Sequence, residues 1–417
     1  MKAARTLGIA AAAIAVALAA GSLWADSRHS AGPYASISRG RYLVRAGDCK
    51  ACHTADGGQP FAGGRAVPTP FGTIYSTNIT PDNDTGIGRW DGDDFYRAMH
   101  NGIDRQGNHL YPAFPYPSYT KLSRDDVRAI KAYLDTVKPV RQRPTPNELP
   151  WPMSMRSMMA VWDGLYFDAG TYRSNPKQSA QWNRGAYLVQ GLGHCGACHT
   201  HKNFAGATDD DHPLRGGYAE HVYAPSLIGN RRDGLGGWSA DDIVEYLATG
   251  SNKESTAAGP MVEVVEQSTQ YLSQPDLRAI AVYLKSLPGN KDDSRTDERA
   301  GDDDTMKRGA QLYVDNCDGC HLRDGSGEPN VFPPLRASSA IQAAKPETLI
   351  QVVLQGYASP ATGPKPTGLA MPAFSDKLSD ADIADVLTYI RNSWGNHAGA
   401  VSSDDVGDLR KTLHQGP

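Results

Sequence analysis

Past its first 25 residues, this 417-residue chain has no apolar run that approaches the length of a membrane span. A transmembrane helix needs about 20 consecutive apolar residues. An excess of basic residues is also missing, because 42 Lys and Arg stand against 46 Asp and Glu, for a formal net charge of -4. We therefore expect a body that is soluble or meets a membrane only through its surface or its partners, and no nucleic-acid surface.

The sequence also lacks a common hydrolase motif and contains few cysteines. The chain contains no Gly-x-Ser-x-Gly turn, the turn that presents a nucleophilic serine in many hydrolases. Cysteine is scarce, and all six residues fall in three copies of the pattern Cys-x-x-Cys-His, from Cys49 to His53, from Cys195 to His199 and from Cys317 to His321. This pattern is typical of a covalently attached c-type haem.

The spacing suits haem attachment, because two thiols three positions apart can form thioethers with the two vinyl groups of one haem, and the next residue offers imidazole to the iron. We predict three haems c with His53, His199 and His321 as proximal iron ligands, held by Cys49, Cys52, Cys195, Cys198, Cys317 and Cys320. A structural zinc site is a weaker alternative, because it needs two cysteine pairs close in space. A thioredoxin-like pair would follow a strand in a βαβ pattern, which none of the three segments resembles.

The first 25 residues have the parts of a secretory signal. Lys2 and Arg5 come first, an Ala-rich apolar run follows from Leu7 to Ala20, and small residues end the segment. We predict a signal peptide at residues 1–25, with an uncleaved anchor as the alternative. Because haem c attachment in bacteria takes place outside the cytoplasm, we expect a periplasmic protein associated with the outer face of the cytoplasmic membrane.

One unit occurs three times along the chain. The segment before each cysteine motif reads Arg-Gly-x-x-Leu, at residues 39–43, 184–188 and 308–312. Each unit closes with an expected helix, at 122–134, 272–284 and 378–390. The expected N-caps of these helices are Ser123, Ser273 and Ser379, and the carboxylates at the third helical position are Asp126, Asp276 and Asp382.

This repeat matches the cytochrome c domain, in which the first and last helices cross with a glycine against an aromatic residue. The expected pairs are Gly40 with Tyr133, Gly185 with Tyr283, and Gly309 with Tyr389. The predicted fold class is all-α, with three tandem cytochrome c-type domains and long loops and linkers. We place the domains at 36–140, 181–288 and 305–396, a linker at 141–180, a charged linker at 289–304 and a tail at 397–417.

Two segments outside the repeats carry apolar residues. The first linker holds Met153, Met155, Met158 and Met159 before Trp162, and we expect this stretch to pack between the first two domains, with a partner surface as the alternative. In the tail, Val406, Leu409 and Leu413 recur at helical spacing after Ser403, a candidate N-cap. There we expect a frayed terminus, with a short amphipathic docking helix as the alternative.

A cytochrome c iron normally takes a methionine sulfur opposite its histidine, and Met371 and Met261 are the expected ligands in the third and second domains. In the first domain Phe114 stands at that position, and phenylalanine cannot ligate iron. The candidates that remain are His109, His100 and Met99, or an open iron. We therefore expect the first haem to be bis-histidine or open, and lower in potential than the other two.

Over nearly its whole mature length the sequence resembles a known family, the three-haem cytochrome c subunits of bacterial membrane-bound dehydrogenases for alcohols, aldehydes, gluconate and related sugars. The resemblance rests on residues 75–81, 181–189, 193–200 and 257–261. It implies an electron-transfer subunit, with catalysis in a flavin, quinoprotein or molybdenum partner and with membrane quinone or another respiratory acceptor. The family usually has methionine where Phe114 stands, so the resemblance supplies no distal ligand for the first haem.

Two other functions stay open from the sequence. A free periplasmic shuttle would need no dedicated partner, although the long linkers favour a subunit. A haem enzyme would act on a small molecule at an open first haem, with His100 or His109 as acid or base. The substrate of any partner dehydrogenase cannot be read from this chain.

Overall fold

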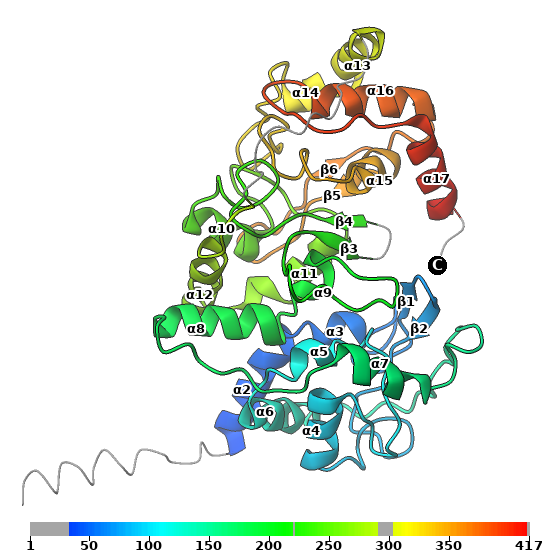
Figure 1. Ribbon diagram of the computed structural model, residues 1–417, viewed down its shortest axis with the longest axis vertical. Coiled ribbons are helices and arrows are strands. Elements are labelled where there is room, and N and C mark those ends of the chain that lie inside the picture. The colour runs from blue at the N-terminus through cyan, green and yellow to red at the C-terminus, as the bar shows by residue number, and fades with distance from the viewer. Residues whose placement is uncertain (1–32, 220–221, 291–302, 415–417) are drawn as a thin grey trace, which may run out of the picture.

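The computed structural model describes residues 33–219, 222–290 and 303–414. The predicted signal peptide lies outside these residues, as does most of the predicted charged linker. Figure 1 shows three groups of helices stacked along the long axis, with the amino-terminal group at the bottom and the carboxy-terminal group at the top. Helices and loops make up most of the described chain, and no helix within it is long and apolar enough to cross a membrane.

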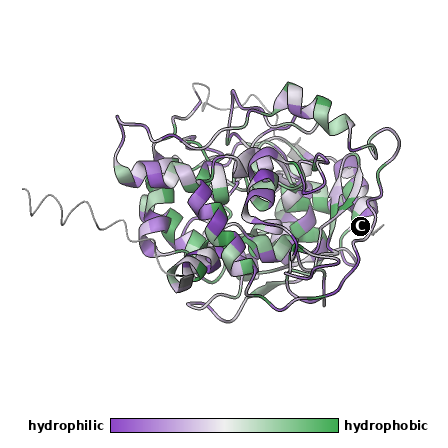
Figure 2. Ribbon diagram, turned by 90° about the horizontal axis from the view of Figure 1, so that it is seen from below, coloured by the Kyte–Doolittle hydropathy of each residue, from purple (hydrophilic) through white to green (hydrophobic). Residues whose placement is uncertain are grey.

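The first unit is built on the crossing of α2 and α6. Its elements are α2 (Pro33–Ala46), α3 (Cys49–Cys52), β1 (Ala66–Thr69), β2 (Gly72–Tyr75), α4 (Gly92–Asn101), α5 (Tyr116–Tyr119) and α6 (Arg124–Leu134). Leu43, Phe95 and Ile130 are buried in its core. Figure 2 shows hydrophobic and hydrophilic residues alternating along the helices, as expected for helices that pack by one face.

The second unit repeats this plan with the crossing of α8 and α12. Its elements are α8 (Ala180–Tyr187), a π-helical turn (Leu188–Leu192), α9 (Gly196–His199), β3 (Gly217–Ala219), β4 (Val222–Ala224), α10 (Ala240–Thr249), α11 (Pro260–Gln267), a 3-10 turn (Thr269–Tyr271) and α12 (Gln274–Lys285). Its core includes Trp238, Ile243 and Leu277.

The third unit is built on the crossing of α13 and α16. Its elements are α13 (Asp303–Asn316), α14 (Asp318–His321), α15 (Glu347–Gln355), β5 (Tyr357–Ala358), β6 (Ala370–Met371), α16 (Asp380–Arg391) and α17 (Ser403–His414). Tyr313, Ile350 and Ile383 are buried in its core.

The predicted helix signals are confirmed. Ser123, Ser273 and Ser379 cap α6, α12 and α16, each accepting a hydrogen bond from the amide of the aspartate three residues later. Each predicted glycine faces its tyrosine across the crossing, since an added Cβ would lie within 2.8 Å of the tyrosine Cβ. The repeat read from the sequence therefore corresponds to one helix crossing used three times.

Short antiparallel hairpins are a feature that the all-α prediction did not include. Among the described residues each unit has one two-stranded sheet, formed by β1 with β2, by β3 with β4 and by β5 with β6. The strands have two to four residues, and β5 and β6 are separated by a long loop, so alternating patterns are too short to be recognised in the sequence. The fold is therefore mainly helical, with three small hairpins.

The methionine-rich linker both packs inward and faces outward. It forms helix α7 (Met158–Tyr166). Met159 and Trp162 are buried in a cluster with Tyr116 of the first unit and Ala207 of the second, so the expected packing between the two units is confirmed for these residues. The other three methionines, Met153, Met155 and Met158, are exposed, and for them the expectation is wrong.

The expectation of a frayed carboxy-terminal segment is wrong. Residues Ser403–His414 form α17, which packs against α15 and α16, and Val406 is completely buried in the third core. The cap is Ser402 rather than Ser403, because the Asp405 amide donates to the Ser402 hydroxyl at 3.1 Å. The apolar face of this segment looked small in the sequence, but it is sufficient to hold α17 in place because α15 and α16 cover it.

The first and second units meet through two reciprocal hydrogen bonds. The Tyr42 hydroxyl donates to the Asp276 carboxylate at 2.6 Å, and the Tyr187 hydroxyl donates to the Asp126 carboxylate, also at 2.6 Å. Tyr42 and Tyr187 hold the same place in the repeat, as do the two aspartates, so the contact is self-complementary, like that of a two-fold dimer. The third unit has Gln311 at the tyrosine position, and its side-chain amide donates to Asp315 instead.

Each of these aspartates is also held by the arginine of its own repeat. Arg39 pairs with Asp126 and Arg184 pairs with Asp276. An apolar side chain also crosses between the two units, since Leu192 of the second unit is buried in the first core. The first two units therefore pack as one body.

Replacing Tyr187 with phenylalanine is expected to lower the free energy of unfolding by about 1–3 kcal/mol, because a largely buried carboxylate loses a hydrogen bond. Burial and the neighbouring Asp126 raise the pKa of Tyr187 to about 12, so it is the neutral hydroxyl that donates. Thermal unfolding followed by circular dichroism measures the loss. Tyr75→Phe is the matched control, since its exposed bond to Glu148 at 3.1 Å contributes little. Equal effects of the two substitutions would contradict the interpretation.

Candidate haem sites

The three Cys-x-x-Cys-His motifs lie at equivalent places in the fold. Each forms a single helical turn directly after the first helix of its unit, in α3, α9 and α14. His199 and His321 are the last residues of their turns, and His53 caps the end of α3. The thiols and the imidazole of each motif are therefore presented by one rigid turn.

The three histidines are oriented in the same way. The Nδ1 atom of His53 lies 2.7 Å from the carbonyl oxygen of Thr77, that of His199 lies 2.7 Å from the carbonyl of Pro225, and that of His321 lies 3.0 Å from the carbonyl of Pro333. A carbonyl only accepts, so Nδ1 carries the proton in each ring. The Nε2 lone pair is then left for a metal, which is the usual arrangement of a ligating histidine.

A common loop supports this orientation in all three units. The carbonyls of His53, His199 and His321 accept hydrogen bonds from the amides of glycines, which are Gly63, Gly216 and Gly327. All three glycines have positive φ angles, between 58° and 93°, a conformation that favours glycine. The loop thus repeats at backbone level, although its length differs between the units.

A second set of bonds closes the same loop. The amides of Ile79, Leu227 and Leu335 donate to the carbonyls of Phe61, Leu214 and Gly325, all at 2.8 or 2.9 Å. Each of these amides lies two residues after the carbonyl that holds its histidine. The carbonyl groups that hold the three histidines were not predicted from the sequence. An aliphatic residue two positions beyond Thr77, Pro225 and Pro333 is the pattern that could have indicated them.

Burial sets the protonation of the motif residues. It lowers the pKa of His53, His199 and His321, against a smaller opposing effect of their carbonyl partners, so the imidazoles are neutral at pH 7. Burial also raises the pKa of Cys49 and Cys195 to about 12. These thiols are not the reactive thiolates of a redox pair.

The cysteines, all six of which are described, form no disulfides. Within the described ranges, no group of three or more His, Cys, Asp or Glu side chains is arranged to hold a metal ion. The motif residues instead fit the covalent haem that the sequence predicts: two thiols and a neutral imidazole on one turn, with Nε2 left for the iron.

The two predicted methionine ligands lie shortly before α12 in the second unit and before α16 in the third. Met371 is in β6, partly buried against the third core. Met261 is in the first turn of α11, after Gly259, which has a φ of 56°, and Pro260. Both methionines thus lie on elements that are fixed by pairing or packing.

The first unit has a different arrangement at the corresponding place. Phe114 packs edge-on against Tyr119, with 5.4 Å between ring centroids. Among the alternative ligands, Met99 is buried in the first core, and the ring of His100 stacks on Tyr96 at 4.9 Å. Both residues thus make packing contacts within the first unit.

His109, the remaining candidate, is held by a carboxylate. Its Nδ1 atom lies 2.6 Å from Asp163 of α7, and the Tyr116 hydroxyl donates to the other oxygen of the same carboxylate at 2.5 Å. Asp163 thus links His109 to the linker helix. A histidine held in this way keeps Nε2 available.

Contacts between units connect the three motifs. α3 of the first motif touches α11, the helix that carries Met261, and Lys50 donates to Gln267 at 3.3 Å. The Tyr357 hydroxyl, on the strand paired with Met371, donates to the carbonyl of Ala257, four residues before Met261. The second site therefore lies between the first and the third, and Figure 1 shows α3, α11 and β5 in that order along the stack.

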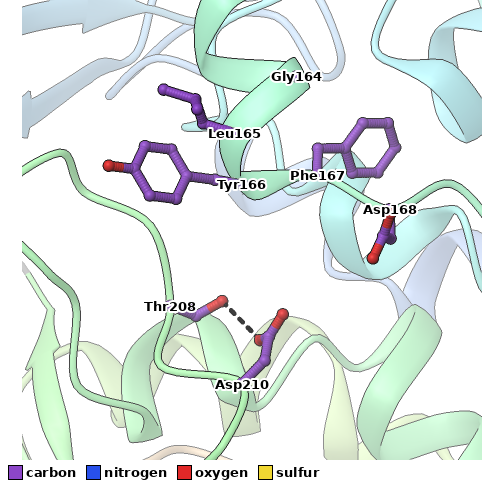
Figure 3. Close-up of a pocket in the computed structure, with 7 residues that line it drawn as sticks. All are labelled: Gly164, Leu165, Tyr166, Phe167, Asp168, Thr208 and Asp210. Carbon is purple, nitrogen blue, oxygen red and sulfur yellow. Dashed lines mark hydrogen bonds between the residues drawn. The ribbon is translucent and has the colours of Figure 1, made fainter.

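A separate cleft of about 250 Å³ opens between the end of α7 and the loop around Thr208 and Asp210 (Figure 3). Tyr166, Phe167 and Asp168 line its other side. The Thr208 hydroxyl donates to Asp210 at 3.1 Å. None of the motif cysteines, motif histidines or candidate distal ligands lines this cleft.

Comparisons with known proteins agree with this geometry. Residues 37–138 match the cytochrome c family model, and residues 304–390 match the model for cytochrome c oxidase, cbb3-type, subunit III. The gluconate 2-dehydrogenase cytochrome c subunit of Pantoea cypripedii is 45% identical over 408 residues, which cover 92% of each chain.

Two other relatives are similar over most of their length. The cytochrome c subunit of the alcohol dehydrogenase (quinone) of Gluconobacter oxydans (strain 621H) is 42% identical over 395 residues, covering 91% of this chain and 83% of the relative. The fructose dehydrogenase cytochrome subunit of Gluconobacter japonicus is 36% identical over 411 residues, covering 92% and 84%. The chain belongs to the family of cytochrome c subunits of gluconate, alcohol and fructose dehydrogenases.

Proposed function

We propose that this chain carries three covalent haems c and passes electrons from a dehydrogenase subunit to a respiratory acceptor. The observation that carries the proposal is the threefold repetition of one arrangement, in which a Cys-x-x-Cys-His turn has its histidine Nδ1 fixed by a backbone carbonyl. A haem supplies reversible one-electron chemistry when bound at such a turn. The protein supplies the attachment, the proximal ligand and the spacing between sites.

The contacts between units support a linear relay. The first unit meets the second through α3 and α11, and the third meets the second through Tyr357 and Ala257. Electrons passing between the first and third sites would use the second, which lies between them. We assign Met261 and Met371 as distal ligands there and in the third unit, because both lie on fixed elements before the last helix.

The first haem is expected to differ from the other two. Phe114 occupies the methionine position, and His109 is the candidate ligand whose Nε2 is not committed by the Asp163 bond. Without a thioether ligand the ferrous state is less favoured, so its potential should be the lowest of the three. We therefore assign it a bis-histidine or open iron.

The names of the relatives support a dehydrogenase partner for this chain. Their names identify subunits of gluconate, alcohol and fructose dehydrogenases, and in one case a quinone. We infer a catalytic partner of flavin, quinoprotein or molybdenum type, a quinone or other acceptor, and a place in the periplasm beside the cytoplasmic membrane. Catalysis on the organic substrate belongs to the partner.

The test is to isolate the protein from its native membranes in mild detergent, weigh the intact chain by mass spectrometry and identify its companions. We expect the mass of the processed chain plus three haems, a dehydrogenase subunit in the same complex, and reduction of the haems by that subunit's substrate. A chain that comes away alone and is reduced by no substrate would favour a shuttle. Rapid carbon monoxide binding to one haem, together with turnover of a small molecule, would favour the haem-enzyme alternative.

A further inference from the structure

Helix α7 and the segment before it expose a row of large apolar side chains. We call this row the α7 apolar surface, and it consists of Trp151, Met153, Met155, Met158, Val161 and Leu165. Trp151 is 78% exposed and Leu165 is 68% exposed. Met158, Val161 and Leu165 are three and four positions apart, so they share one face of the helix.

The face of α7 next to this surface is already packed. Met159 and Trp162 are buried against the first and second units, and the Trp162 indole donates to the carbonyl of Ala205 at 2.9 Å. Because its inner face fixes the helix, the outer face cannot turn inward. Figure 3 shows the Leu165 side chain pointing away from the loop that carries Thr208 and Asp210.

The α7 apolar surface carries no exposed charge. Residues 151–165 include two charged side chains, Arg156 and Asp163, and both are used internally. Arg156 donates to the carbonyl of His109 at 3.1 Å and lies over the ring of Tyr111. Asp163 accepts from His109 and Tyr116. The remaining exposed side chains of residues 151–165 are apolar, apart from Ser154 and Ser157.

We propose that the α7 apolar surface binds the surface of a zwitterionic lipid bilayer, an inference that rests on the proposed place of the protein beside a membrane. Interfacial binding is driven by buried apolar area, and tryptophan is enriched at the boundary between headgroups and acyl chains. A protein interface would carry about one hydrogen bond per 100–200 Å². The six side chains of this surface offer a single donor, the Trp151 indole.

Electrostatics favour neutral over anionic lipid. The surface offers no lysine or exposed arginine to anionic headgroups, and the whole chain has a net charge of -4. Binding should therefore need no anionic lipid and should resist salt. An attachment through α7 would place both the first and the second unit beside the bilayer, because Tyr116 of the first unit and Ala207 of the second pack against the inner face of the helix.

The experiment compares two triple variants of the haem-loaded protein. Mass spectrometry first identifies the amino-terminal residue of each purified protein. One variant is Trp151→Ser, Val161→Ser and Leu165→Ser. The control is Val314→Ser, Val331→Ser and Leu369→Ser, which removes three exposed apolar residues from the third unit. Each protein is floated with phosphatidylcholine vesicles at low and high salt, and its haem spectrum and circular dichroism are recorded to verify folding.

We expect the wild type and the control to bind phosphatidylcholine vesicles equally at both salt concentrations. The α7 variant should bind at least about tenfold more weakly, because its three serines bury far less apolar area in the bilayer than Trp151, Val161 and Leu165. Equal binding of the two variants, absent binding of the wild type, or binding only to anionic vesicles would overturn the proposal. Loss of a dehydrogenase subunit from the α7 variant, with vesicle binding unchanged, would assign the surface to that subunit. None of these outcomes depends on haem number or reduction, which test the proposed function.

Discussion

Replacing Gly185 with valine is expected to unfold the second unit and to prevent stable attachment of its haem. Gly185 lies where α8 crosses α12, and an added Cβ would overlap the carbonyl oxygen of Ala279 and come within 2.8 Å of the Tyr283 Cβ. Neither atom can move aside without moving α12, since the Ala279 oxygen belongs to the helix backbone and the Tyr283 Cβ is bonded directly to it. The two helices would have to separate along their main contact.

The expected loss for Gly185→Val is about 3 kcal/mol or more in the free energy of unfolding, at the upper end for an overpacked core. The first unit should be weakened too, because Leu192 and Tyr187 of the second unit pack on it. Haem content per chain and thermal unfolding measure the effect. Gly237→Ala is the control, since its added Cβ meets no heavy atom within 4 Å. A variant that kept all its haems and its melting temperature would show that the crossing tolerates separation.

Replacing Phe114 with methionine is expected to raise the lowest of the three haem potentials, by on the order of 0.1 V within the ~0.8 V range that axial ligands span. A thioether sulfur stabilises ferrous over ferric iron, and Phe114 aligns in the sequence with Met371 of the third unit. Methionine is flexible enough to fill the space left by the ring, so the cost in stability should be below about 1.5 kcal/mol.

The readouts for Phe114→Met are a redox titration and the far-red absorbance band of methionine-ligated ferric haem, which should gain the contribution of a third haem. Phe114→Leu is the matched control, because it removes the ring contact with Tyr119 without offering sulfur. A methionine variant indistinguishable from the leucine variant in band and potential would show that this position does not face the iron. His109 or an open site would then have to be sought by other variants.

Local sequence signals were reliable where a single turn decides the structure. Ser123, Ser273 and Ser379 cap their helices as predicted, because a serine hydroxyl reaches an amide three residues later whatever surrounds it. The hairpins escaped prediction, because strands of two to four residues show too little alternation.

Segments whose environment comes from elsewhere in the chain were misjudged. The tail looked too weakly apolar to be ordered, yet Val406 and Leu409 are buried under helices whose positions the local sequence does not reveal. The linker methionines divided between a buried and an exposed face according to where Tyr116 and Ala207 lie. Burial is a property of the assembled surface, so spacing alone could not assign it.

By itself, the sequence determined the three attachment motifs, the helix crossing and the missing methionine at Phe114, because each depends on residue identity at short spacing. Only the tertiary structure decided which carbonyls orient His53, His199 and His321, since the partners lie 12 to 26 residues away across loops of different length. It also decided the reciprocal contact between the first two units and the exposed face of α7. Both arise from surfaces that exist only after distant helices have packed together.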